Sequence, residues 1–169
     1  MVRPLVRYGS GGLAVPAARV ERIDDSIPLL VRDMVDTMYA APGVGLAAPQ
    51  IGVGLRICVI DLSVGKRPGD LHVLINPEFV TREGLQVEDE GCLSVPGFTA
   101  SIARPARAVV RALDADARPV TVEGTGLLAR ALQHELDHLD GLLFLDRMRR
   151  LRRRLIVGKI DALRRRGRW

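Results

Sequence analysis

TGLLARALQHELDHL, residues 125–139, is the most informative segment of this chain. It predicts a helix that ends before Gly141, because glycine is common just after a helix C-terminus. Within it, His134-Glu135-Leu136-Asp137-His138 is an HExxH motif. Side chains four residues apart share one face of a helix, so the imidazoles of His134 and His138 can reach one metal ion. The Glu135 carboxylate would lie beside them, where it can take a proton from water on that ion.

A third metal ligand would distinguish an enzyme from a helix whose polar face matches the motif by chance. Metzincin proteases place a histidine six residues after the second one, but position 144 here is Phe. Other zincins use a glutamate further downstream, where this chain is rich in arginine and Asp161 is the only acid. Upstream, Cys92 offers a thiolate, although a lone cysteine is more often an ordinary buried residue.

Different patterns flank the HExxH helix. Residues 25–40 predict a helix that Asp25 or Ser26 can cap, with apolar side chains at helical spacing. Short β-rich runs separated by turn clusters predict strands at 55–61, 71–76, 107–113 and 119–122, and a last helix is expected over 147–166. Strands in the middle and helices at the ends predict an α+β fold, with a mostly antiparallel sheet packed around the HExxH helix. We expect residues 1–169 to form a single domain.

Composition narrows the class of protein further. Hydrophobic residues make up 47% of the 169 and charged residues 27%, which is typical of an ordered globular chain. The longest apolar stretch, residues 44–60, is interrupted by Gln50 and Arg56, so no membrane span is expected. No secretory signal is expected either, and the acid-free residues 1–20 only weakly resemble a transit peptide. Two cysteines favour a reducing compartment, the cytoplasm, with Cys58 as a buried core thiol.

The positive charge is concentrated at the C-terminal end. Residues 147–169 carry a net charge of +10, whereas the rest of the chain carries −5. We expect a basic helix there that binds ribosomal RNA, with a merely solvated surface as the alternative. Four apolar side chains at helical spacing are expected to hold it against the body: Met148, Leu151, Leu155 and Leu163.

Three segments together resemble a known family. Gly43-Val44-Gly45-Leu46-Ala47-Ala48-Pro49-Gln50, Glu90-Gly91-Cys92-Leu93-Ser94 and Gln133-His134-Glu135-Leu136-Asp137-His138 are similar, in order and spacing, to the motifs of peptide deformylases. The resemblance extends over nearly the whole chain. The glycine-rich segment lacks the lysine of a phosphate-binding loop, so no nucleotide cofactor is expected.

The resemblance implies a metallohydrolase that removes the formyl group from the first methionine of new proteins and releases formate. It implies Cys92, His134 and His138 as metal ligands and Glu135 as the general acid/base. The Gln50 amide and the Leu93 backbone N–H would form the oxyanion hole. Methionine and the peptide backbone would be bound by Val44, Gly45, Gly91, Leu127 and Ala131.

Several points stay open at the level of sequence. The ligand types alone favour zinc, whereas the resemblance implies iron(II), replaceable by nickel, cobalt or zinc. Glu90 could orient a ligand or form a surface salt bridge. Ala14 and the region of Thr99 depart from relatives that carry arginine there, and His72 is assigned no role. The alternatives are a zincin protease, which Phe144 disfavours, and an RNA-binding module whose structural metal would have a fourth protein ligand.

Overall fold

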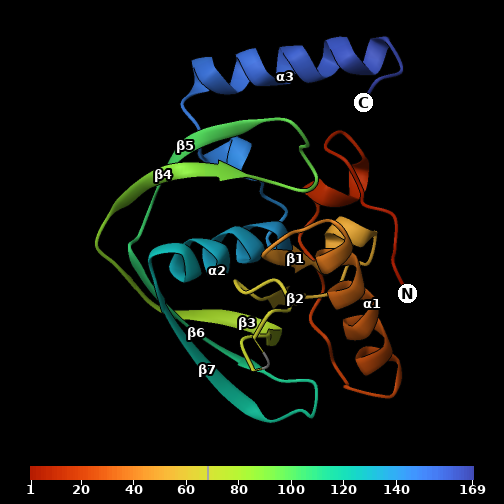
Figure 1. The fold of residues 1–169 in the computed structure, drawn as a ribbon, viewed down its shortest axis with the longest axis vertical. Helices are drawn as coiled ribbons and strands as arrows, with labels where there is room; N and C mark the ends of the chain where they lie inside the picture. The colour runs from red at the N-terminus through yellow and green to blue at the C-terminus, as the bar shows by residue number, and fades with distance from the viewer. Residues whose placement is uncertain (68) are drawn as a thin grey trace.

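The computed structural model describes residues 1–67 and 69–169 of the chain (Figure 1). Its longer helices are α1 (Ser26–Ala40), α2 (Gly126–Leu139) and α3 (Arg150–Arg165). Short 3-10 helices are η1 (Gly11–Ala14), η2 (Ala48–Ile51) and η3 (Phe144–Arg147). The strands are β1 (Gly45–Ala47), β2 (Ile57–Ile60), β3 (His72–Glu83), β4 (Gln86–Gly91), β5 (Thr99–Arg104), β6 (Arg107–Leu113) and β7 (Pro119–Thr125).

The strands form two antiparallel sheets. The larger has the order β1-β2-β3-β6-β7, and β4 pairs with β5 in the smaller. Strand β2, Ile-Cys-Val-Ile, is buried throughout because both faces of the sheet are covered. Cys58 and Ile60 face a core cluster that includes Leu132 of α2, whereas Ile57 and Val59 belong to the cluster with α1. The two helices therefore cover opposite faces of this end of the sheet.

Helix α2 lies between the two sheets (Figure 1). Every residue from Ala129 to Leu139 is buried. Its apolar side packs on the larger sheet, while the Arg130 guanidinium donates to the carbonyl of Ile102 in β5 at 3.0 Å. The HExxH helix is thus the centre of an α+β fold with antiparallel sheets, and the predicted fold class is confirmed.

The structure changes some local expectations. Asp25 occupies the N-cap position of α1, as expected, but makes no side-chain capping bond. The Asp24 carboxylate instead accepts from the Ser26 backbone N–H at 3.0 Å and from its hydroxyl at 2.6 Å. Strands β4 and β5 lie outside the runs expected from sequence. Strand β4, Gln-Val-Glu-Asp-Glu-Gly, buries only one residue, so it lacks the apolar alternation by which strands are recognised.

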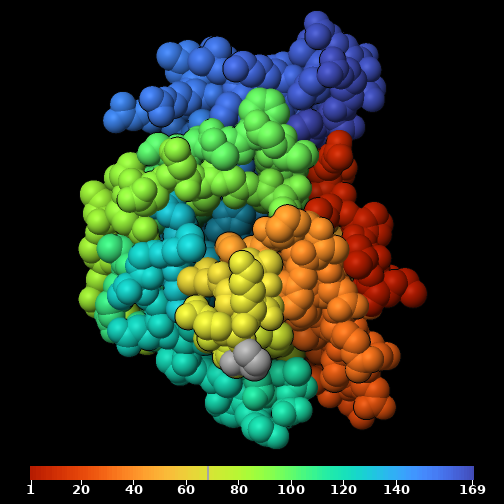
Figure 2. All heavy atoms as spheres, viewed as in Figure 1, coloured from red at the N-terminus to blue at the C-terminus, as the bar shows by residue number. Residues whose placement is uncertain are grey.

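The apolar face expected for the C-terminal helix is only partly right, because Met148 packs on the body but Leu151 and Leu155 do not. Leu151 and Leu155 are 70% and 60% exposed, and α3 packs instead through Ile156 and the fully buried Ile160. Leu151 and Ile160 are nine residues apart and so lie on opposite faces of the helix, of which the Ile160 face meets the body. Helix α3 lies across β5 at one end of the molecule (Figure 2). Among the helices described, none is both long and apolar enough to cross a membrane.

Candidate metal centre

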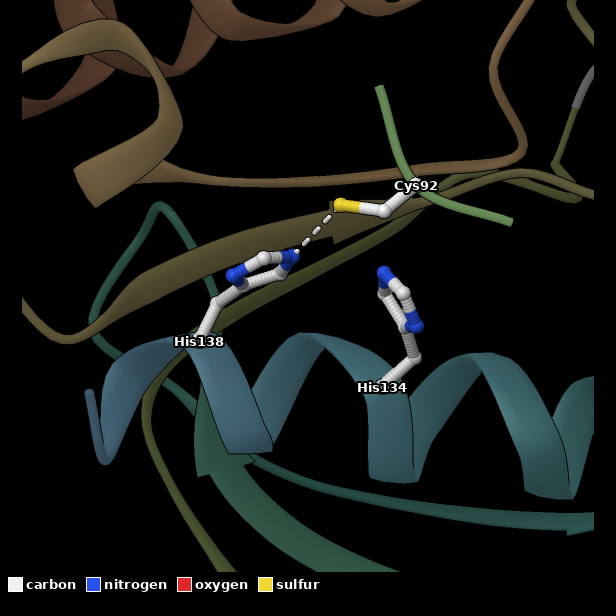
Figure 3. Close-up of side chains that lie close together, drawn as sticks. All are labelled: Cys92, His134 and His138. Carbon is white, nitrogen blue, oxygen red and sulfur yellow. Dashed lines mark hydrogen bonds between the residues drawn. The ribbon is translucent and has the colours of Figure 1, made fainter. Parts of the chain in front are cut away.

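Cys92, His134 and His138 converge at one point (Figure 3). Cys92 immediately follows β4, and the histidines lie one turn apart on α2. The Cys92 sulfur is 3.1 Å from His138 Nε2, and one ligand atom from each residue lies within 4.8 Å of the other two. Ligand atoms that each lie about 2.0–2.3 Å from one ion are at most about 4.6 Å apart, so these three atoms are close enough to bind the same ion. The group has three members in the described part of the chain, one cysteine and two histidines. A structural metal site usually has four protein ligands, so this group resembles a catalytic site more closely.

Glu90 fixes the orientation of His134. Its carboxylate lies 2.6 Å from His134 Nδ1, which leaves Nε2 as the ring nitrogen that can bind a metal. Glu90 is 5% exposed, so the surface salt bridge considered from sequence is wrong. Burial opposes its ionisation, but contacts with His134 and Arg104 hold its pKa below the usual range. Burial also lowers the pKa of His138, which keeps that imidazole neutral, as a metal ligand must be.

A buried network of charges supports Glu90, and sequence reasoning did not find it. Arg104 bridges the Glu90 and Asp137 carboxylates at 2.6 and 2.7 Å, and Arg130 reaches Glu90 at 2.7 Å. From η3, Arg147 holds the other oxygen of Asp137 at 2.6 Å. Arg130 lies four residues before His134 on α2, and Asp137 lies three residues after it. This helical spacing could have placed both side chains near the site from sequence alone. Arg104 belongs to β5, and nothing local connects it to this site.

Glu135 presents a carboxylate beside the histidines. It is 3% exposed, and its Oε2 is buried without a hydrogen-bond partner among the described residues. Burial raises its pKa to about 7, a value suited to taking up and returning a proton near neutral pH. Gly45 makes room for it, because a Cβ at that position would collide with the Glu135 carboxylate.

Hydrogen-bond donors gather around Cys92. The Gln50 side-chain oxygen accepts from the Ala47 backbone N–H at 2.9 Å, which turns the amide nitrogen toward Cys92 Sγ (3.5 Å) and Ser94 Oγ (3.2 Å). The Leu93 backbone N–H has no acceptor within the described residues. Ser94, which was given no role from sequence, also donates its backbone N–H to Cys92 Sγ at 3.4 Å.

Most of these groups line a cleft of about 810 Å³: Gln50, Glu90, Cys92, Leu93, His134 and Glu135. In Figure 2 the surface is hollowed below β4 and β5, between α2 and the segment that follows α1. The cleft brings together the residues expected to bind methionine and the peptide: Val44, Gly45, Gly91, Leu127 and Ala131. Cys58 is fully buried in the core, as expected, and His72 lies away from the cleft at the start of β3.

An α+β fold built around an HExxH helix, with a Cys-His-His cluster and a buried carboxylate at the end of an apolar cleft, defines a candidate metallohydrolase. The polypeptide deformylase family model matches residues 2–154. The chain belongs to this family, and it is therefore a hydrolase that acts on the N-formyl group of peptides.

Individual relatives agree with this assignment over most of their lengths. The chain is 46% identical to the peptide deformylase of Acidobacterium capsulatum over 169 residues, covering 100% of this chain and 99% of the relative. It is 54% identical over 147 residues to that of Acetivibrio thermocellus, covering 87% and 84%. The crystal structure of a peptide deformylase from Legionella pneumophila superposes with a TM-score of 0.92 at 43% identity, covering 99% and 98%. A Synechococcus elongatus peptide deformylase in complex with actinonin gives a TM-score of 0.87 at 42% identity, covering 98% and 88%.

Proposed function

We propose that this chain hydrolyses the formyl group from the initiator methionine of nascent polypeptides with the help of one divalent metal ion. The observation that carries the proposal is the arrangement at the inner end of the cleft. Three atoms that can bind one ion meet there with an oriented amide NH₂ group and with a carboxylate oxygen that has no hydrogen-bond partner among the described residues. These are the groups that hydrolysis of an amide-type bond requires.

The metal would be held by Cys92, His134 and His138. The mix of one thiolate and two imidazoles suits zinc or iron, and the family resemblance favours iron(II). When bound, such an ion supplies Lewis acidity and a water molecule of lowered pKa. Glu90 would keep His134 in the tautomer that binds through Nε2, because it accepts a hydrogen bond from Nδ1 at 2.6 Å.

Glu135 would be the general acid/base. Its partner-free oxygen can accept a proton from the attacking water and later return it to the amine that leaves. A pKa near 7 allows both transfers without a large driving force in either direction. The Gly45 backbone lies against the carboxylate and limits its movement.

Gln50 and Leu93 would stabilise the negative charge that develops on the formyl oxygen. The Ala47 N–H already orients the Gln50 amide, so its NH₂ group would only have to exchange the long contact with Cys92 Sγ for the formyl oxygen. One such donor is typically worth about 3–4 kcal/mol of the barrier. Ser94 would help to hold the Gln50 amide through its hydroxyl.

The cleft would bind the substrate in an extended form. Strand β4 pairs with β5 alone in its sheet, so its other edge, which ends at Gly91, is free to pair with a peptide. Leu127 is 55% exposed at the cleft and Ala131 is buried within it, as expected for an apolar pocket that accepts methionine. The small formyl group would be the only acyl group with room to approach the metal.

Formate release from a panel of peptides tests this function. Protein prepared without oxygen should cleave formyl-Met peptides far faster than acetyl-Met or formyl-Asp peptides. Comparable kcat/KM on all of these substrates would contradict the proposal. Cleavage of unformylated peptides within the chain would instead indicate a protease.

We further propose that α3 binds ribosomal RNA and that the protein works in the cytoplasm. Arg150, Arg152 and Arg154 are exposed on α3 and have no ion-pair partner among the described residues. A surface of this kind attracts phosphate, and an enzyme that acts on nascent chains must meet them as they leave the ribosome.

A further inference from the structure

The N-terminal segment places an arginine at the cleft. The Val6 backbone N–H donates to the Gln50 carbonyl and the Tyr8 N–H donates to the Ser94 carbonyl, both at 2.8 Å. Val6 and Tyr8 pack against the apolar cluster beneath them. Arg7, between them, is exposed and lines the cleft. Its backbone is therefore anchored to two residues that themselves contact Cys92.

The side chain of Arg7 lies beside Trp169. The Arg7 guanidinium carbon lies 6.0 Å from the centre of the Trp169 ring, within the range of a cation–π contact. Trp169 is itself fixed, because its Nε1 donates to the Tyr8 carbonyl at 2.8 Å and its ring centre is 6.1 Å from that of Phe98. Phe98 also lines the cleft. The C-terminus thus supports one rim of the cleft.

Arg7 differs from the other arginines that line the cleft. Arg3 pairs with Asp33 at 2.6 Å, and Arg130 pairs with Glu90 at 2.7 Å. Arg7 has no carboxylate within 4.0 Å among the residues that the structure describes. Asp89 also lines the cleft, but no ion pair joins it to Arg7. A guanidinium held at a cleft with its donors free is suited to binding a carboxylate.

We infer that Arg7, positioned by Trp169, is a substrate-binding residue that favours peptides with an acidic side chain shortly after the formylated methionine. An extended peptide advances about 3.3 Å per residue, and Arg7 is flanked by residues bonded to the inner end of the cleft. The acidic side chain therefore belongs to the second or third residue of the substrate. This inference rests on the proposed function and adds a substrate preference to it.

The test compares formyl-Met peptide amides that carry Glu, Gln or Lys at residue two or three. The parent should prefer Glu to Gln by about fivefold in kcat/KM, as an exposed ion pair allows, and should disfavour Lys. In Arg7→Gln the preference for Glu over Gln and Lys should disappear. The change should lie in KM, which should rise for the Glu peptide, and kcat should stay the same. Arg22→Gln, an exposed arginine away from the cleft, is the control and should keep the order.

Trp169→Leu tests the positioning role separately. It retains the charge of Arg7 but removes the ring, so the preference for Glu should shrink and the KM for the Glu peptide should rise with kcat unchanged. A parent that cleaves the Glu and Gln peptides equally well, or a preference that survives Arg7→Gln, would overturn the inference. Failure of the parent to release formate from any peptide would overturn the proposed function instead. Titration calorimetry with the same peptides would still report whether affinity for Glu depends on Arg7.

Discussion

Cys92 contributes a thiol to the candidate metal site, whose other two members are the imidazoles of His134 and His138. Its sulfur accepts hydrogen bonds from Gln50 and from the Ser94 backbone, so the structure holds it in place before any ion binds. Cys92→Ala should therefore remove a preorganised ligand and lower metal affinity by at least tenfold, with little loss of folding. Metal analysis after gel filtration measures this. Cys58→Ala, which changes a thiol fully buried in the core, is the control and should retain metal; stoichiometric metal in Cys92→Ala would assign the third ligand to another residue.

Gly45 provides a second test at the scale of a single residue. An added methyl group would collide with the Glu135 carboxylate and push it away from its position. Gly45→Ala should lower kcat by about a hundredfold, near the lower end of what general acid–base catalysis contributes, while Cys92 and both histidines still bind metal. The matched control is Gly54→Ala, because a methyl group at Gly54 meets no atom within 4 Å. Unchanged kcat in Gly45→Ala would mean that Glu135 does not need this position.

Helix α3 carries the prediction that belongs to a secondary-structure element. Arg164 is left unchanged in this test, because its guanidinium lies against Gly9 of the N-terminal segment. Replacing Arg150, Arg152 and Arg154 with Gln removes exposed charge and spares the buried Ile160. Ribosome co-sedimentation should weaken. The slope of log affinity against log salt concentration should also become less steep, by about 0.7–0.9 for each phosphate that the variant no longer neutralises.

The control for this test changes the same number of charges elsewhere. Arg22, Arg32 and Arg118 are exposed and lie outside α3, so their replacement with Gln should leave ribosome binding intact. Peptide deformylation should persist in both variants. Equal ribosome affinity and equal salt dependence in the two variants would identify the arginines of α3 as a solvated surface only.

The whole molecule should unfold as a single domain. Helix α2 packs on the larger sheet through apolar side chains and joins the β4–β5 pair through the buried charges of Arg104, Glu90 and Asp137, so none of these parts should unfold alone. Calorimetry should give one transition. Removing the metal with a chelator should lower Tm. An ion whose free concentration is a thousand times its Kd stabilises the folded state by about 4 kcal/mol. Two separate transitions would contradict the single domain, and a Tm unaffected by chelation would contradict metal binding in the folded state.

The sequence predicted those parts of the molecule that local patterns encode. The apolar periodicity of α1 and the HExxH spacing of α2 are properties of single helices, and both appear in the structure. Strands β4 and β5 were missed because paired backbone, and not an apolar pattern, defines them. The packing expected for α3 was wrong at Leu151 and Leu155 because Leu151 and the buried Ile160 lie on opposite faces of one helix. Arg104 joins the site through contacts remote in sequence, which no local pattern encodes.

The central claim is that Glu135 transfers the proton during hydrolysis of the formyl group. Glu135→Gln keeps the shape of the side chain and leaves Cys92, His134 and His138 free to bind metal, but it cannot accept a proton. Formate release from a formyl-Met peptide, measured together with metal content, tests the claim most directly. We predict full metal occupancy and a loss of about 10²–10⁴-fold in kcat. Fully metallated Glu135→Gln with activity within about tenfold of the parent would contradict this account.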